Sequence, residues 1–285
     1  PLLFDRLSIP SPYCYRCPMG QGLDPSTCGD ACTEEAVARI LRHGDELAAV
    51  IVEPGLQGAG GMIDQPPGYL KAIREASERV GALLIADEVA VGFGRSADAL
   101  FACQREGVRP DLLCLGKGLT GGYLPMAATL STEPIFDAFR GPPAEGRTFF
   151  HGHTFTGNAL AASAALATLE IFESDDVMAG LPAKAEALEA ELERVSSLPG
   201  VGQIRRYGLA VGIELVADRA TRREFPPEER RGMRVCRHCV RNGVFLRPLG
   251  DVVVLMPPLS ITQAEIVRLV DALEAALRAE VGDGT

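Results

Sequence analysis

Three short apolar segments that end in charged residues alternate with helical segments in the first half of the sequence. The apolar segments are AAVIVE (48–53), ALLIADE (82–88) and DLLCLGK (111–117). Helices are expected from Thr33 to Gly44, over 69–80 after Pro67, and from Ser96 to Glu106. This alternation is typical of an α/β protein with a parallel sheet. Groups at the carboxyl ends of parallel strands line the ligand crevice, so we expect Asp87, Glu88 and Lys117 to face one cleft.

The order of elements changes after residue 158. Long Ala- and Leu-rich helices run to about residue 195, and strands over 204–216 and 244–259 then alternate with helices near 228–241 and from Thr262. Thr262 and Glu265 are spaced as a capping box. The sequence therefore predicts a large α/β domain over residues 1–178, with a parallel-rich sheet, and a small C-terminal α+β domain over residues 179–285.

The charge balance limits the partners of the chain. Its 285 residues include 28 Lys and Arg against 38 Asp and Glu, which gives a net charge of −10. This excess of acid argues against nucleic acid or an anionic membrane surface as a partner. No apolar run approaches the roughly 18 residues of a membrane-spanning helix, and the first residues, PLLFDRL, resemble no secretory signal. We expect a cytoplasmic protein, and because the chain does not begin with Met we expect an upstream portion.

Lys117 stands between Gly116 and Gly118 at the end of a predicted buried strand. Desolvation there favours the neutral amine, and small neighbours let a flat cofactor approach. Such an amine forms Schiff bases, and Asp87 at the end of a neighbouring strand suits a protonated pyridine nitrogen. The pair indicates pyridoxal phosphate (PLP) chemistry. The alternative is a surface lysine together with an aspartate that caps a helix.

The segment LLIADE suggests a second alternative, because it resembles the magnesium-binding strand of ATPases. That class needs the phosphate loop G-x-x-x-x-G-K-[ST]. The GKG around Lys117 has neither the spacing nor the hydroxyl, so the sequence disfavours an ATPase.

Four of the eight cysteines lie near the start of the chain. Cys14 and Cys17 form one close pair, and Cys28 and Cys32 form another, in a Pro- and Gly-rich segment. Four thiols at such spacing are typical of a zinc site or an iron–sulfur cluster. The alternative is four reduced thiols in a surface loop.

Four blocks of the sequence resemble the successive signature blocks of the class III PLP-dependent aminotransferases. They are IVEPGLQGAGGM (51–62), LLIADEVAVGFGRS (83–96), DLLCLGKGLTGGYLP (111–125) and HGHTFTGN (151–158), in the order and at the spacing of that family. The resemblance implies the fold-type I, aspartate aminotransferase-like fold, PLP as cofactor and amino-group transfer. The family's Gly-Ser phosphate segment and ring-stacking aromatic residue have no counterpart here, so the N-terminal part of the large domain is expected to be missing.

The same resemblance implies a role for each cofactor-binding residue. Lys117 would carry the cofactor covalently and move the reacting proton. Asp87 would keep the pyridine nitrogen protonated, and Val89 would pack against one face of the ring. His153 and Thr154 match a pair that reaches the cofactor phosphate from the other subunit of a homodimer, which would make the active site a shared one.

Arg247, in RPLGD (247–251), and Gly152 match substrate-binding positions of the family. A planar guanidinium holds a carboxylate at two points. Within the family, the blocks most resemble members that act in biotin biosynthesis. This implies amination of 8-amino-7-oxononanoate to 7,8-diaminononanoate, with S-adenosylmethionine or lysine as donor. Another class III ω-amino acid or diamine transaminase is an alternative, and so is an inactive fragment that acts only as an interaction module.

Overall fold

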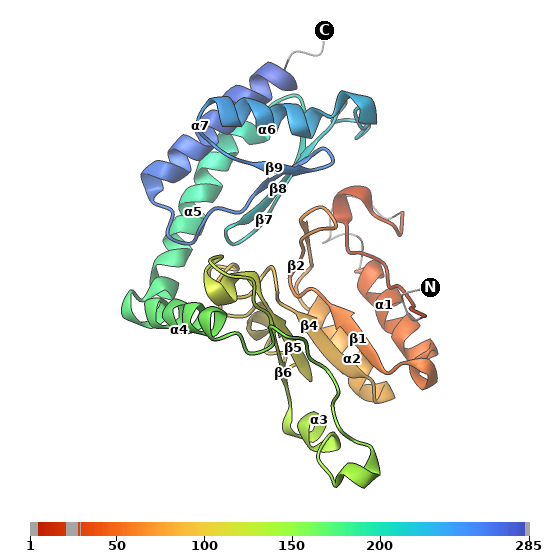
Figure 1. Ribbon diagram of the computed structural model, residues 1–285. Coiled ribbons are helices and arrows are strands. Elements are labelled where there is room, and N and C mark those ends of the chain that lie inside the picture. Colours follow the sequence, from red (N-terminus) through yellow and green to blue (C-terminus); the bar gives the residue numbers. More distant parts are fainter. Residues whose placement is uncertain (1–4, 21–27, 29, 283–285) are drawn as a thin grey trace. The chain divides into compact units, whose positions relative to one another are not determined.

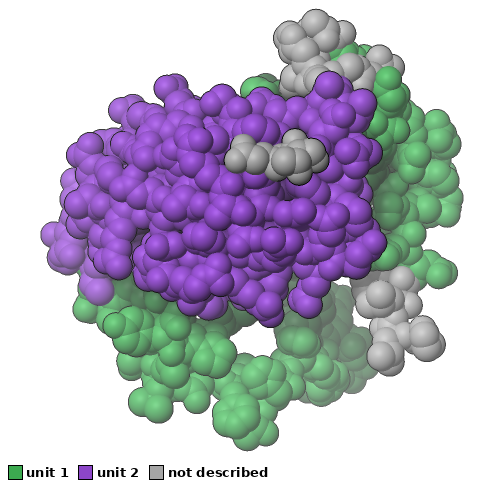
Figure 2. Space-filling model, turned by 90° about the horizontal axis from the view of Figure 1, so that it is seen from above, with its two compact units in different colours: residues 1–55, 65–92, 102–170 green, residues 56–64, 93–101, 171–285 purple. Residues whose placement is uncertain are grey.

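The computed structural model describes residues 5–20, 28 and 30–282, and the chain divides into two compact units (Figures 1 and 2). Unit 1 consists of Pro1–Gly55, Gln65–Gly92 and Ala102–Glu170, and unit 2 of Leu56–Asp64, Phe93–Phe101 and Ile171–Thr285. Two segments from the first half of the chain, 56–64 and 93–101, therefore pack with the C-terminal half. The predicted domain boundary after residue 178 stays a prediction.

The sheet of unit 1 has the strand order β1-β4-β5-β6. Strands β1 (Ala49–Val52), β4 (Leu83–Asp87) and β5 (Leu112–Leu115) run parallel, and β6 (Ala128–Ser131) is antiparallel to β5. The sheet is parallel-rich, as predicted. Its register places Asp87 beside Cys114, so the charged end of β4 and the end of β5 lie at the same edge of the sheet.

Helix α2 (Tyr69–Val80) packs against β1 and β4, and α1 (Ala31–Arg42) packs against α2 (Figure 1). Both helices were predicted, and Gly81 ends α2 in the left-handed conformation with φ +72°. The predicted N-cap of α1 at Thr33 is wrong. The carbonyl of Asp30 accepts hydrogen bonds from the N–H groups of Thr33 and Glu34, so the first turn begins earlier, at Ala31.

The helix predicted from Ser96 to Glu106 does not form. Only Ala102–Glu106 is helical, as the 3₁₀ turn η3. Phe93 and Ala97 have positive φ values of 55° and 72°, which a continuous α-helix does not allow. The Ser96 hydroxyl instead closes a local turn by donating to the carbonyl of Ala99 at 3.1 Å.

Short turns and one long apolar helix complete unit 1. The elements are η1 (Cys14–Arg16), η2 (Gly44–Glu46), η4 (Lys117–Thr120), α3 (Glu133–Ala138), η5 (Pro143–Glu145) and α4 (Ala159–Ser174), whose end reaches unit 2. On α4, Leu160 is 73% exposed and Leu166 is 62% exposed. A helix with this much exposed apolar surface is typical of an interaction face.

Unit 2 combines an antiparallel sheet with three helices, which agrees with the predicted α+β fold. Its sheet has the order β7-β8-β10-β9. The elements are β2 (Leu56–Gln57), β3 (Ile63–Asp64), α5 (Val177–Ser196), β7 (Val201–Tyr207), β8 (Ala210–Leu215), η6 (Pro227–Glu229), α6 (Arg231–Arg241), β9 (Arg247–Leu249), β10 (Val252–Leu255) and α7 (Gln263–Glu280).

Two segments predicted as single strands are hairpins. The segment 204–216 turns at Gly208 between β7 and β8, and the segment 244–259 turns at Gly250 between β9 and β10. Both glycines have positive φ values, 57° and 58°. A Cβ atom at Gly208 would lie 2.3 Å from the carbonyl oxygen of Arg95, so no side chain fits at this turn.

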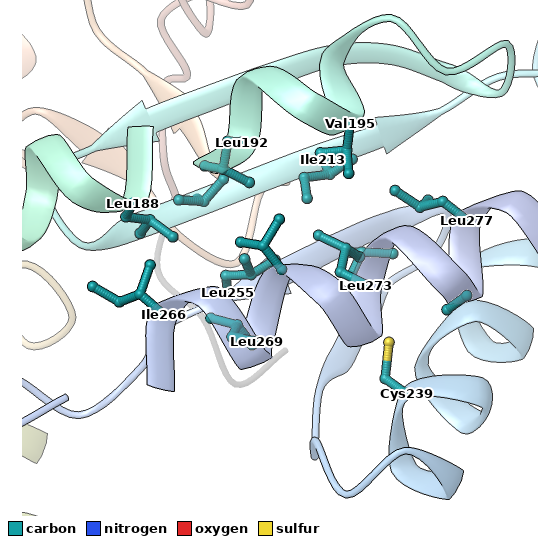
Figure 3. Packing of buried hydrophobic residues seen from close by; sticks show 14 of the residues in the cluster. Leu188, Leu192, Val195, Ile213, Cys239, Leu255, Ile266, Leu269, Leu273 and Leu277 are labelled. Carbon is teal, nitrogen blue, oxygen red and sulfur yellow. The ribbon is translucent and has the colours of Figure 1, made fainter. Parts of the chain in front are cut away.

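The core of unit 2 lies between its sheet and helices α5 and α7 (Figure 3). Leu188, Leu192 and Val195 of α5 meet Ile266, Leu269, Leu273 and Leu277 of α7, with Ile213 and Leu255 from the sheet, and all are buried. The predicted capping box of α7 is confirmed: Thr262 Oγ1 accepts from the N–H of Glu265, and the Glu265 carboxylate accepts from the N–H of Thr262. Among the described residues, no helix is both long and apolar enough to cross a membrane.

Candidate active site

Asp87 and Lys117 lie at the same edge of the unit 1 sheet. Asp87 is the last residue of β4 and pairs with Cys114, and Lys117 follows Cys114 by three residues. Adjacent strands are about 4.8 Å apart and three residues span at most about 10 Å, so the two Cα atoms lie within about 15 Å of each other. A lysine side chain and one small aromatic ring can bridge this gap.

Val89 and Gly116 bring the two segments into contact. A Cβ atom at Gly116 would lie 3.2 Å from Cγ1 of Val89, which is tighter than an ordinary contact. The backbone that precedes Lys117 therefore packs directly against the Val89 side chain, two residues after Asp87. Lys117 itself has a φ of +41°, a strained conformation of a kind that clusters at functional sites.

The side chains of Asp87 and Lys117 can each form further hydrogen bonds. Oδ1 of Asp87 accepts a hydrogen bond from the N–H of Val89 at 3.1 Å. Within residues 5–20, 28 and 30–282, the second oxygen of Asp87 accepts no hydrogen bond, and the Lys117 amine forms no ion pair or hydrogen bond. Burial raises the pKa of the Cys114 thiol, and the negative charge of Asp87 adds to this effect.

The surroundings of Lys117 differ from the expectation. The side chain is exposed, so the part of the chain that the structure describes does not desolvate the amine as predicted. Gly116 directly follows strand β5, and the approach of a flat cofactor beside it stays a prediction. The lysine therefore has the predicted position without the predicted burial.

Glu88 does not share a cleft with Asp87 and Lys117, and that expectation is wrong. Successive side chains of a strand point to opposite faces. Glu88 is 0% exposed, and its carboxylate accepts hydrogen bonds from the N–H groups of Ala102 and Cys103.

Gly152, His153 and Thr154 lie in an exposed loop before α4. The N–H of His153 donates to Oγ1 of Thr156 at 2.9 Å, and Nδ1 of His153 accepts from the N–H of Phe155 at 3.1 Å. A ring whose Nδ1 accepts carries its proton on Nε2. The loop is thus a hydrogen-bonded turn that presents its side chains outward, and their contact with the cofactor stays a prediction.

Arg247 begins strand β9 in unit 2, opposite Val254 of β10. Its side chain is exposed and has no ion pair among the described residues. The guanidinium is therefore available to a carboxylate, and its role in substrate binding stays a prediction.

The metal site predicted at Cys14, Cys17, Cys28 and Cys32 stays a prediction, and the part of the chain described gives it no support. Within it, no three His, Cys, Asp or Glu side chains gather so as to hold a metal ion. Cys32 lies on the buried face of α1, where burial raises the pKa of its thiol, while Cys14 begins the separate turn η1. A thiol kept protonated in a core is a poor metal ligand.

The comparisons with known proteins decide the family. The model of the family "Aminotransferase class-III" matches residues 9–277. The chain belongs to the class III aminotransferases. It is 54% identical over 284 residues to the adenosylmethionine-8-amino-7-oxononanoate aminotransferase of Nitratidesulfovibrio vulgaris, with 100% of this chain and 52% of the relative covered. The enzyme of the same name from Geobacter sulfurreducens is 51% identical, with 99% and 62% covered.

Solved structures of aminotransferases share the fold of this class III chain. The adenosylmethionine-8-amino-7-oxononanoate aminotransferase of Methanocaldococcus jannaschii matches with a TM-score of 0.86 at 44% identity, over 88% of this chain and 58% of that chain. A PLP-bound amine transaminase from an uncultivated Pseudomonas species matches with a TM-score of 0.86 at 38% identity, over 95% and 61%. The chain spans between 52% and 62% of the length of the two curated relatives above.

PLP is the cofactor of class III aminotransferases, and the residues of this site suit it. The second oxygen of Asp87 can accept a hydrogen bond from a ring N–H, and the Lys117 amine can bond to an aldehyde. The absence of a side chain at Gly116 lets Val89 pack directly beside the residue that precedes Lys117. The site therefore offers an acceptor for the ring nitrogen of PLP and an amine for its aldehyde.

The structure brings together the segments of the predicted residues Asp87, Val89 and Lys117, whereas sequence reasoning missed the hydrogen bonds of Glu88. A carboxylate at the end of an apolar strand was taken for a cleft residue. The signal that could have revealed it is strand alternation, which places Glu88 on the face opposite to Asp87.

Proposed function

We propose that the protein containing this chain transfers an amino group to 8-amino-7-oxononanoate and produces 7,8-diaminononanoate in biotin biosynthesis. The observation that carries the proposal is the convergence of Asp87, Val89 and Lys117 at one sheet edge. The names of relatives with 43–54% identity support the substrate. Their names also favour S-adenosylmethionine as the donor, with lysine as the second candidate.

The proposed chemistry divides between the cofactor and the chain. Bound PLP supplies an aldehyde and a ring that withdraws electrons from the reacting carbon. Lys117 holds the cofactor through its amine and, once its nitrogen is released, accepts and returns the proton at the reacting carbon. Asp87 accepts the hydrogen bond of the ring N–H and keeps that nitrogen protonated. Val89 packs against the ring and orients it.

Arg247 is proposed to bind the carboxylate of 8-amino-7-oxononanoate. The planar guanidinium offers two parallel N–H groups to a carboxylate, and no described acidic side chain occupies them. Gly152 is proposed to lie beside the substrate. Among the described atoms, Oγ1 of Thr156, at 3.6 Å, is the only one within 4 Å of a Cβ placed at Gly152, so the space beside it is open.

A homodimer with shared active sites is part of the proposal, with His153 and Thr154 reaching the cofactor phosphate of the partner subunit. Exposed apolar side chains support a subunit interface here. Phe150 is 91% exposed, and Leu166 of α4 is 62% exposed. Changing Leu166 to Glu is expected to shift the protein from dimer to monomer in analytical ultracentrifugation, and an unchanged dimer would contradict this interface.

We place the protein in the cytoplasm. The net charge of −10 and the small-molecule substrate support this assignment. The buried thiols of Cys103, Cys236 and Cys239 also suit a reducing compartment.

The experiment that tests the cofactor assignment uses the three lysines of the sequence, Lys71, Lys117 and Lys184. The protein is mixed with PLP, reduced with borohydride and mapped by peptide mass spectrometry. Label is expected on Lys117 alone, and a Lys117→Ala variant is expected to lose it. Lys71 and Lys184 serve as internal controls, since Lys184 donates to the carbonyl of Leu259. Preferential labelling of either control would overturn the assignment.

A class III transaminase with another acceptor is the second candidate, because an amine transaminase matches at 38% identity. An acceptor screen on the full-length protein separates the two: preference for pyruvate over 8-amino-7-oxononanoate would favour the second. A chain without activity would take up no PLP and show no visible absorbance band.

A further inference from the structure

Glu88 is a fully buried carboxylate next to the proposed cofactor ligand Asp87. Its Oε2 accepts the N–H of Ala102 at 2.6 Å, and its Oε1 accepts the N–H of Cys103 at 2.7 Å. Short hydrogen bonds to an ionised acceptor are the strong ones in proteins. Both oxygens are thus directed to the start of η3.

These two hydrogen bonds join Glu88 to the residues that follow the segment 93–101. Residues 65–92 and 102–170 belong to unit 1, whereas the intervening segment 93–101 packs in unit 2. The carboxylate of Glu88 therefore joins the point where the chain leaves unit 1 to the point where it returns.

The backbone of Glu88 is held as firmly as its side chain. Its N–H donates to the carbonyl of Cys114 on β5 at 3.0 Å, and its carbonyl accepts the N–H of Gly92 at 2.9 Å. Hydrogen bonds of both the backbone and the carboxylate thus fix the residue that follows Asp87. Glu88 directly follows the last residue of β4, and its N–H still donates to β5, so the alternation of side chains extends from Asp87 to Glu88. Fixing the direction of Glu88 therefore also fixes the direction of Asp87.

We propose that Glu88 is a positioning residue, whose buried carboxylate fixes the end of β4 and thereby aims the carboxylate of Asp87 at the cofactor nitrogen. This inference rests on the proposed function, since it assigns Asp87 to the cofactor. Burial raises the pKa of the Glu88 carboxyl, while the hydrogen bonds from Cys103 and Ala102 favour its ionised form.

The test compares the Glu88→Gln variant with the wild-type protein. The first measurement is made without cofactor. The amide of glutamine has the same shape but keeps one acceptor oxygen, so one of the two N–H groups loses its partner. Amide hydrogen exchange is expected to speed up by about tenfold at residues 102–103 and also at 87–89, which corresponds to the loss of one buried hydrogen bond.

The second readout is the visible circular dichroism of bound PLP, which reports how the ring is held. The signal is expected to weaken in Glu88→Gln, and the dissociation constant of PLP is expected to rise by about tenfold. Glu214→Gln is the matched control, because Glu214 is also a buried carboxylate but lies on β8 of unit 2. It is expected to lower stability and leave both PLP readouts unchanged.

A second variant removes the same contact from the other side. Ala102→Pro deletes one N–H donor at the first position of η3, where a helical turn tolerates proline. Ala102→Pro is expected to reproduce the changes in hydrogen exchange and in circular dichroism. It tests the role of the Glu88 contact even if the Glu88→Gln variant does not fold.

The proposal is overturned if either variant changes exchange at 102–103 but leaves 87–89 and the dichroism of bound PLP as in the wild type. Failure of the wild type to bind PLP would refute the proposed function instead, while the exchange measurement would still report on the link from Glu88 to β4.

Discussion

Arg205 offers the sharpest test of how unit 2 is held together. Its guanidinium is buried on β7 and donates to the Glu214 carboxylate at 2.5 Å. It also donates to the carbonyls of Gly61 at 2.8 Å and Met62 at 3.0 Å, which precede β3. One side chain thus satisfies a buried charge and two backbone groups of the segment 56–64. Its removal leaves all three without this donor.

Changing Arg205 to Met is expected to lower the free energy of unfolding by about 3–5 kcal/mol, the usual effect of removing one partner from a buried ion pair. With a urea m-value of about 2 kcal/mol/M, the midpoint falls by about 1.5–2.5 M. Because the buried carboxylate of Glu214 loses the guanidinium of Arg205 in this variant, the deficit is expected to shrink at low pH, where the carboxylate takes up a proton.

Arg206 supplies the matched control on the same strand. It pairs with Glu189 at 2.6 Å, but the two side chains are 27% and 57% exposed. Arg206→Met is therefore expected to cost at most about 1 kcal/mol. The double variant Arg205→Met, Glu214→Leu is expected to recover most of the loss, since the buried carboxylate is removed together with the guanidinium. Equal midpoint shifts for Arg205→Met and Arg206→Met would refute the reasoning.

Three further predictions test other contacts. Thr262→Ala is expected to lower the free energy of unfolding by about 1 kcal/mol, whereas Thr132→Ala, at an N-cap without a side-chain hydrogen bond, is expected to cost less in the same urea titration. Burial raises the pKa of the Glu88 carboxyl above its ordinary value of 4.5. The free energy of unfolding of the wild type, relative to that of Glu88→Gln, is therefore expected to fall as the pH rises from 4.5 to the raised pKa and to level off above it. A difference that does not change with pH would contradict this. Gly116→Ala is expected to weaken PLP binding, because the new Cβ would press on Val89, and an unchanged dissociation constant in a titration followed by visible absorbance would contradict this.

Local patterns predicted the elements whose ends are marked by local chemistry. Helix α2 has an apolar face and Gly81 at its end, and α7 has the Thr262–Glu265 capping box, so both could be placed from the sequence. The hairpins at Gly208 and Gly250 were missed because apolar residues stand on both sides of each turn, so that each segment was taken for one strand. The missing helix after Ser96 has another cause, since the segment 93–101 takes its conformation from packing in unit 2.

The candidate site shows the same division between local and distant causes. Asp87 and Lys117 could be predicted because each ends or follows an apolar strand, and parallel strands end at one edge. The direction of Glu88 depends on where the chain returns at Ala102, after a segment that packs elsewhere. The exposure of Lys117 likewise depends on groups far from it in sequence. The position of a residue along a strand can therefore be predicted from the local sequence pattern. Its burial and hydrogen bonds cannot, because they depend on residues that are distant in the sequence.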